Sequence, residues 1–243
     1  MTLMPGSLMA LPGTLLSPTI FDPVLLGNGW RWQPLDWLVG PGNGDLEIAA
    51  GEIVARWPAR ELGHRVLGHR VLDRRVLVGH SAGGVVALQV AAQLGCELDG
   101  LILIDTGASA AHHGDPDLPQ RLLAQWGEAF IETFLLRCIG EEPLTRHGDE
   151  LRRYALSAGP QRAYRAMTSL RRLDLTGRLG DIRCPTLVVH GERDPARSLQ
   201  HARALTSGIA GARLEILDAG HTPMLERPEA LATCLDDFLA TLD

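Results

Sequence analysis

The chain alternates short apolar runs with longer helical patterns, and this alternation narrows the possible folds more than any other feature. Four runs, RVLVG, LILID, TLVVH and RLEIL, are apolar enough to be buried on both faces of a sheet. Strands that alternate with helices form a mostly parallel sheet with crossover helices. We therefore predict an α/β protein with about six core strands, at Leu8–Leu11, Leu35–Val39, Arg75–Gly79, Leu101–Asp105, Thr186–His190 and Arg213–Leu217.

The helical patterns fall between these strands and are expected to cover both faces of the sheet. They lie at Leu46–Arg56, Gly83–Leu94, Leu199–Thr206 and Pro228–Leu242. Residues 106–181 break the alternation, because they hold no strand candidate and their apolar side chains recur at helical spacing. The sequence thus predicts a core of residues 1–105 and 182–243, with residues 106–181 forming a helical cap, or lid.

Composition excludes several functions. All 23 basic residues are arginine, so a Schiff-base lysine, a pyridoxal phosphate anchor and a P-loop lysine are impossible. The net charge of -6, with no block of one sign, argues against nucleic acid or an anionic membrane as a partner. No run of about 18 apolar residues is present to span a membrane.

The cysteines and histidines give no metal signature. Four scattered cysteines fit neither a zinc site nor a CxxC pair, which favours a reduced, cytoplasmic protein. The neighbouring His112 and His113 lie in a polar loop of the predicted cap, where solvated side chains are the simpler interpretation. We predict no metal and no cofactor, and the oligomeric state is left open.

The segment VLVGHSAGGVVALQVA carries the strongest chemical signal. A buried strand leads through Gly79-His80-Ser81-Ala82-Gly83 directly into a helix, which is the context of a nucleophile elbow. Glycines two positions before and after the serine allow a tight, strained turn. Ser81 is therefore the predicted nucleophile, and the Ala82 amide is a predicted oxyanion donor.

A serine nucleophile needs a base, and the base needs a carboxylate that fixes its tautomer. His221 follows the last apolar strand in a loop bounded by Gly220 and Pro223, whereas the side chain of His80 is expected to point away from the nucleophile. Asp194 follows the buried strand TLVVH, and Asp105 at the end of LILID is the alternative acid. The predicted order of Ser81, Asp194 and His221 along the chain is that of α/β-hydrolases.

The second oxyanion donor is expected in the turn LPGTLLSP after the first strand. Pro12 has no N–H, so the donor is Thr14, or Leu15 as the second choice. The predicted substrate-binding residues are Leu15 and three aromatic residues of the cap: Trp126, Phe130 and Phe134.

The chain resembles α/β-hydrolases with a lid over nearly its whole length, through LPGTLLSP, GHSAGG, GERD and DAGHTPMLERPE. The resemblance implies a Ser81–Asp194–His221 triad and a cap over the pocket. It also implies that the first two strands of the family's eight-stranded sheet are missing here.

Together these features predict a serine hydrolase for a small-molecule carboxylic ester, thioester or lactone. The predicted cap offers apolar side chains and no evident arginine clamp, so the substrate is expected to be small to medium in size and largely apolar. The same fold also supports C–C bond hydrolysis, acyl transfer or lyase chemistry, and a ligand-binding receptor with a nearly silent triad is a third possibility.

Overall fold

The computed structural model describes residues 6–27, 29–40, 42–57, 74–110 and 115–242. The predicted loop histidines His112 and His113 lie outside these residues. The protein is built around a six-stranded sheet in the order β2-β1-β3-β4-β5-β6, in which every neighbouring pair is parallel. The strands are β1 (Gly6–Leu11), β2 (Arg31–Pro34), β3 (Arg74–His80), β4 (Gly100–Ile104), β5 (Thr186–Gly191) and β6 (Arg213–Leu217).

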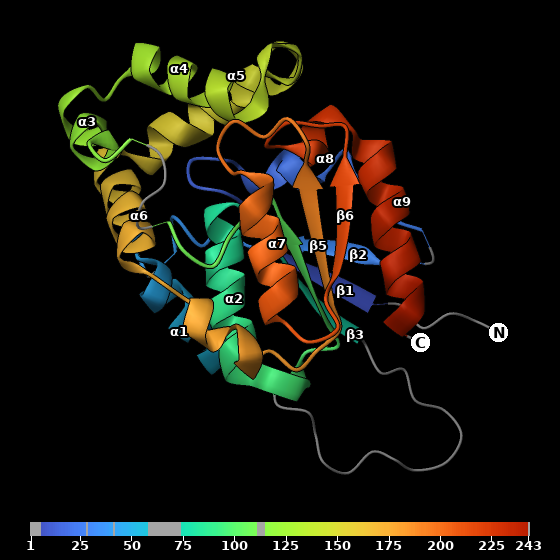
Figure 1. Ribbon diagram of the computed structural model, residues 1–243. Helices are drawn as coiled ribbons and strands as arrows, with labels where there is room; N and C mark the ends of the chain where they lie inside the picture. The colour runs from blue at the N-terminus through green and yellow to red at the C-terminus, as the bar shows by residue number, and fades with distance from the viewer. Residues whose placement is uncertain (1–5, 28, 41, 58–73, 111–114, 243) are drawn as a thin grey trace.

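Helices cover both faces of this sheet, as predicted. Helices α1, α2 and α7 lie on one face and α9 on the other (Figure 1). Their bounds are α1 Leu46–Arg56, α2 Ala82–Leu94, α7 Leu199–Gly208, α8 Pro223–Glu226 and α9 Pro228–Leu239. Short 3-10 turns are η1 Pro18–Phe21, η2 Gly95–Glu97, η3 Thr176–Asp181 and η4 Ala240–Leu242. Asp45 begins α1 because its side chain accepts from the Glu47 and Ile48 amides.

The central strands are buried and the edge strands are not. All residues of β4 and β5 are buried, as parallel strands covered on both faces should be. The prediction that RLEIL is buried on both faces is wrong, since β6 is an edge strand with no fully buried residue and Ile216 is 47% exposed.

The predicted strand Leu35–Val39 is also wrong, because the second strand is Arg31–Pro34. This strand lies at the other edge of the sheet and is largely exposed, so its sequence RWQP lacks an apolar signal. Pro34 fits there because an edge strand leaves one row of amides without partners. The apolar residues that suggested a strand instead form a turn, in which Trp37 Nε1 donates to the Pro12 carbonyl at 2.7 Å.

The described part of segment 106–181, here called the inserted segment, holds four α-helices, of which α4 and α5 lie beyond the carboxyl ends of the strands (Figure 1). These are α3 (Leu118–Ala124), α4 (Glu128–Ile139), α5 (Glu141–Ala158) and α6 (Pro160–Arg172). Tyr154 Oη donates to Asp36 at 2.8 Å, and Ser17 Oγ donates to Glu150 at 3.0 Å, which ties the segment to the core. Its two ends meet in an isolated antiparallel bridge between Ser109 and Asp174.

Two further observations concern the cysteines and the apolar character of the helices. All four cysteines are free, and Cys184 is buried. Among the residues that the structure describes, no helix combines the length and apolar character needed to cross a bilayer.

Candidate active site

Ser81 lies in a strained turn between β3 and α2. Its backbone angles are φ 53° and ψ -119°, a conformation that side-chain-bearing residues rarely adopt. The turn is held on both sides, because the Ser81 amide donates to the Ile104 carbonyl at 3.0 Å and Thr106 Oγ1 donates to the Ser81 carbonyl at 2.6 Å. The core therefore fixes the position of the serine before any substrate arrives.

Glycines around the serine allow this close packing. A Cβ on Gly83 would lie 2.2 Å from the Leu11 carbonyl oxygen, and one on Gly79 would lie 2.5 Å from the Gly84 Cα. Both neighbours are backbone atoms that cannot move aside without shifting β1 or α2. The glycines of the GHSAGG motif thus serve the contact between the elbow and the sheet.

The structure brings Ser81, His221 and Asp194 into one hydrogen-bonded chain. His221 Nε2 lies 3.0 Å from Ser81 Oγ, and His221 Nδ1 lies 2.8 Å from Asp194 Oδ2. These residues come from the elbow, from the loop after β6 and from the loop after β5, so three separate strand ends build the chain. The arrangement lets His221 accept the serine proton while the carboxylate stabilises the resulting imidazolium.

Asp194 is held in its ionised form. Burial alone would raise its pKa, but hydrogen bonds from His221 and from the Ala196 and Arg197 amides lower the pKa overall. The two amides donate to Oδ1 at 2.6 and 3.0 Å, which leaves Oδ2 for His221. An anionic acid with all its oxygens engaged suits the task of orienting the imidazole.

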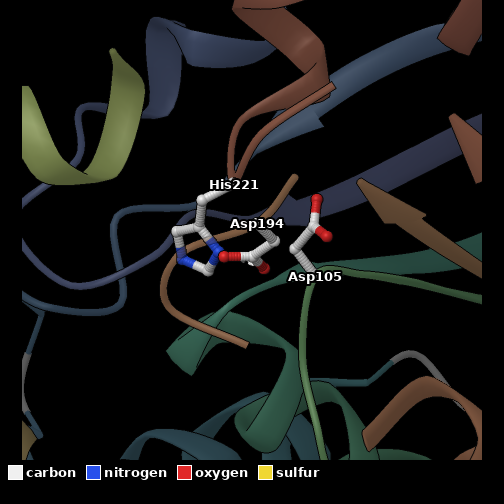
Figure 2. A group of neighbouring side chains, drawn as sticks. All are labelled: Asp105, Asp194 and His221. Carbon is white, nitrogen blue, oxygen red and sulfur yellow. Dashed lines mark hydrogen bonds and ion pairs between the residues drawn. The ribbon is translucent and has the colours of Figure 1, made fainter. Parts of the chain in front are cut away.

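Asp105, the alternative acid, lies on the side of Asp194 away from His221, and His221 Nδ1 is hydrogen-bonded to Asp194 instead (Figure 2). It is completely buried, and its Oδ1 accepts from the Gly191 amide at 2.7 Å. Burial and the charge of Asp194 raise the pKa of Asp105 well above its usual range, and Asp105 Oδ2 has no hydrogen-bond partner among the described residues. The surroundings thus shift the pKa values of these two neighbouring carboxyl groups in opposite directions.

Asp105, Asp194 and His221 each place one potential metal ligand atom within 4.8 Å of the others. Two of these atoms, His221 Nδ1 and Asp194 Oδ2, are bonded to each other. The raised pKa of Asp105 also disfavours the anionic form that a cation needs. These donors therefore fit a metal ion poorly.

Replacing Asp105 by asparagine is expected to stabilise the fold more as the pH rises. The pKa of Asp105 is raised in the folded state, so its contribution to the free energy of unfolding is fully present below its unfolded pKa of about 3.9. This contribution is lost as the pH rises through the folded pKa. Asparagine does not titrate, so the gain in unfolding free energy over wild type should be larger at pH 8 than at pH 4. Urea unfolding at both pH values measures it, and a gain that shrinks with pH would contradict the assignment.

His80, the neighbour of Ser81 in the sequence, contacts the main chain of His221. Its Nε2 lies 2.7 Å from the His221 carbonyl oxygen, and the ring is fully buried. Burial and the neighbouring His221 lower the pKa of His80 to about 3, so the ring is neutral and Nε2–H donates to the carbonyl. His80 therefore holds the main chain of the predicted base.

Removing this hydrogen bond is expected to lower turnover. His80→Ala should reduce kcat by about 10- to 100-fold with a smaller change in KM, because a misplaced imidazole slows proton transfer. Glutamine can supply an amide donor at a similar distance, so His80→Gln should recover part of the loss. Steady-state kinetics with an ester substrate tests both, and equal losses in the two variants would show that the ring's bulk, not its hydrogen bond, matters.

Glu226 is a second residue that the motif analysis did not single out. Its Oε2 accepts from the Gly220 amide at 2.6 Å, and its Oε1 accepts from the Thr222 amide at 3.1 Å. These amides flank His221, so one carboxylate clamps the loop on both sides of the histidine. Glu226 lies within the quoted segment DAGHTPMLERPE, and its spacing of five residues from the histidine was the available signal.

The two predicted oxyanion donors, Ala82 and Thr14, line the same cavity as Ser81. Ala82 is the first residue of α2, so its amide has no partner within the helix. Thr14 is buried and lines the same cavity as Ser81 and Ala82, whereas Leu15 does not line it. Of the two alternatives for the second donor, Thr14 is thus the one that faces the site.

A cavity of about 450 Å³ opens next to Ser81 and His221. Its apolar wall includes Leu16, Phe130 and Phe134, so two of the predicted substrate-binding residues lie there. Leu15 and Trp126 are not among its lining residues. Leu15 has φ 62° and is fully buried in the core, and Trp126 lies in the break between α3 and α4 that interrupts the single predicted helical stripe.

The expectation that the site has no arginine clamp is wrong. Four arginines and one aspartate line the cavity: Arg121, Arg137, Arg171, Arg197 and Asp115. The arginines come from α3, α4, α6 and the loop after β5, so their convergence could not be read from their spacing along the chain. The cavity is positive in a chain whose net charge is -6.

Fold and site together define an α/β protein with a serine at a strained turn between a buried strand and a helix, and comparison with known proteins agrees with this class. A family model described as the alpha/beta hydrolase family matches residues 10–233. The chain therefore belongs to the α/β-hydrolase family.

Relatives within the family act on different substrates. A pimeloyl-[acyl-carrier protein] methyl ester esterase of Aromatoleum aromaticum is 29% identical over 90% of this chain and 98% of its own length. A 2-hydroxy-6-oxo-6-phenylhexa-2,4-dienoate hydrolase of Comamonas testosteroni is 29% identical over 67% of this chain and 62% of its own. Several other curated relatives are likewise matched over about two thirds of their length or less.

Among solved structures, the enol-lactonase from Burkholderia xenovorans LB400 superposes with a TM-score of 0.80. The match covers 97% of this chain and 91% of the enol-lactonase at 20% identity, so it shows a shared fold.

Proposed function

We propose that the protein is a serine hydrolase that cleaves a carboxylic ester, thioester or lactone of small to medium size through an acyl-enzyme on Ser81. The observation that carries this proposal is the chain of hydrogen bonds from Ser81 Oγ to His221 and Asp194, at 3.0 and 2.8 Å. These distances are those at which a base removes the proton of a serine nucleophile.

The reaction proceeds in two halves. In the first, His221 Nε2 takes the proton of Ser81 Oγ as the oxygen attacks the carbonyl carbon, and the oxyanion accepts hydrogen bonds from the Ala82 and Thr14 amides. The tetrahedral intermediate collapses, and His221 donates its proton to the departing alcohol or thiol. In the second half, His221 takes a proton from water, which attacks the acyl-enzyme, and the proton returns to Ser81 as the acid leaves.

The surroundings suit a substrate of limited size. A cavity of about 450 Å³ lies in the range of small-molecule sites. Helices α3, α4 and α6 contribute Leu118, Phe134 and Met167 to its wall, so the inserted segment acts as the lid over the substrate. Movement of this lid would admit substrate and release product.

The relatives support hydrolysis of an ester carbon–oxygen bond as the preferred reaction. The methyl ester esterase is matched over nearly its entire length, and an ester is the bond that its name specifies. The Comamonas relative is named as a hydrolase of a dienoate. Cleavage of a bond other than an ester, in the same kind of pocket, is therefore the alternative reaction to compare with ester hydrolysis.

Reaction with a fluorophosphonate tests the nucleophile directly. Intact mass of the wild-type protein should increase by one adduct, and Ser81→Ala should show none. A panel of nitrophenyl esters and thioesters of graded acyl length would then define the preferred acyl group. A folded wild-type protein that takes no adduct and cleaves no member of the panel would favour a ligand-binding protein with a silent triad.

A further inference from the structure

The cavity beside Ser81 contains a buried arginine without a partner. Arg197 is 4% exposed, lines the cavity, and its Nη1 is buried with no hydrogen-bond partner. Within the described part of the chain, its guanidinium makes no ion pair and no side-chain hydrogen bond; only its main-chain amide is engaged, to Asp194. A buried cation that lacks such partners costs free energy in the unliganded protein.

The charge of Asp194 acts on this arginine without forming a hydrogen bond to its guanidinium. Asp194 raises the pKa of Arg197 by its charge, but burial is the larger effect and lowers the pKa overall. The Asp194 oxygens already accept from the Ala196 and Arg197 amides and from His221. The side chain of Arg197 is therefore free to bind an anion that enters the cavity.

The other arginines of the cavity differ in this respect. Arg121 pairs with Asp115 at 2.7 Å, and Arg171 donates to the Asp115 carbonyl. Arg137 on α4 is exposed and has no ion pair or hydrogen bond from its side chain among the described residues. Arg197, which is buried, and Arg137, which is exposed, are thus the two lining arginines with side chains available to bind a ligand.

We propose that the natural substrate carries a carboxylate, and that Arg197 binds it while the ester carbonyl lies at Ser81. The proposal rests on the proposed function for the position of the ester. A guanidinium binds a planar carboxylate through two parallel hydrogen bonds, and it does so more strongly in a desolvated pocket than in water. The apolar wall formed by Leu16, Phe130 and Phe134 suits the carbon chain that separates the two groups.

Three esters and three variants test this assignment. The esters are nitrophenyl hexanoate, which is neutral, mono-nitrophenyl adipate, which is acidic on the acyl side, and hexanoyloxybenzoate, which is acidic on the alcohol side. Arg197→Gln removes the charge and Arg197→Lys keeps it. Arg178→Gln is the control, because Arg178 is an exposed arginine of η3 that pairs with Asp181 and does not line the cavity.

The ratio of wild-type to variant kcat/KM is compared between substrates, so differences in leaving group cancel. For one of the two acidic esters, Arg197→Gln should lower kcat/KM by about tenfold or more beyond its effect on the neutral ester, as expected for the loss of a charged hydrogen bond. Arg197→Lys should fall between, and Arg178→Gln should treat all three esters alike. The acidic ester that responds identifies which side of the substrate carries the carboxylate.

Equal losses for all three esters in Arg197→Gln would overturn the proposal, because Arg197 would then act only on Asp194. No loss for any ester would overturn it as well. Thermal unfolding separates these outcomes from misfolding: since the charge is unpaired, Arg197→Gln should not lower Tm.

A binding measurement keeps the inference independent of turnover. Calorimetry on the Ser81→Ala protein should show that one of the two acidic esters, mono-nitrophenyl adipate or hexanoyloxybenzoate, binds about tenfold tighter than nitrophenyl hexanoate, and that adding Arg197→Gln removes the difference. Equal affinities would overturn the carboxylate assignment even if ester hydrolysis is observed. If instead the acid binds more tightly but no ester is cleaved, the proposed function fails while the anion site stands.

Discussion

Replacing Ser81 by alanine is expected to lower kcat/KM for ester hydrolysis by about 10⁴-fold or more, since the nucleophile of such a chain cannot be substituted by its partners. The hydrogen-bonded path from Asp194 through His221 ends on the Ser81 hydroxyl at 3.0 Å, and alanine removes only that hydroxyl. The measurement is single-turnover and steady-state hydrolysis of a nitrophenyl ester, with the purified variant checked by circular dichroism.

Stability supplies the control for this variant. Alanine keeps the strained backbone at φ 53°, so Ser81→Ala should unfold close to wild type, whereas Ser81→Gly relieves the strain and should be about 1 kcal/mol more stable. Both should be inactive. Residual turnover above about 1% of wild type in either variant would refute the role of Ser81, because direct attack by water in the remaining pocket is far slower.

Asp194→Asn should be nearly as damaging, with kcat falling by about 10³- to 10⁴-fold. The asparagine amide would present a donor or an uncharged acceptor to His221 Nδ1, which disfavours the tautomer that accepts the serine proton. It would also remove the charge that stabilises the imidazolium. Kinetics of Asp194→Asn with the same ester measures the effect.

Asp105→Asn is the matched comparison, since it makes the same chemical change one carboxyl group further from the histidine. An amide resembles a protonated carboxyl group in shape, and its oxygen can accept from the Gly191 amide as Asp105 Oδ1 does. We expect kcat/KM within about tenfold of wild type, because His221 keeps its own partner. A larger loss in Asp105→Asn than in Asp194→Asn would mean that Asp105 is the acid.

Much of the core could be predicted from the sequence, and so could the hydrogen-bonded residues Ser81, His221 and Asp194. The sequence patterns that indicate them are local. The elbow is a strand, a glycine-flanked serine and a helix within sixteen residues of sequence, VLVGHSAGGVVALQVA. Once the strands are parallel, their carboxyl ends share one edge, so residues that follow different strands must meet there. Asp194 and His221 could therefore be predicted from the strands that they follow, without using their separation in the sequence.

The errors arose where a residue's environment depends on distant parts of the chain. RWQP and RLEIL differ in apolar content, yet both are edge strands, and position in the sheet is set by pairing rather than by composition. Trp126 follows a helical spacing that a break at Gln125–Gly127 interrupts. The cavity arginines lie on separate elements, and only the packing of α3, α4 and α6 over the sheet brings them together.

Ser109 and Asp174 are bridged, and the Leu175 amide donates to the Ala108 carbonyl at 2.8 Å. The inserted segment thus begins and ends at neighbouring points of the core. The sheet could therefore pair in the same way whether a long segment or a short turn joined these two points. Such a junction lets insertions be exchanged, lengthened or grafted between proteins without redesigning the strands. The helices that cover the cavity can therefore change while the core elements that carry Ser81, Arg197 and His221 stay in place.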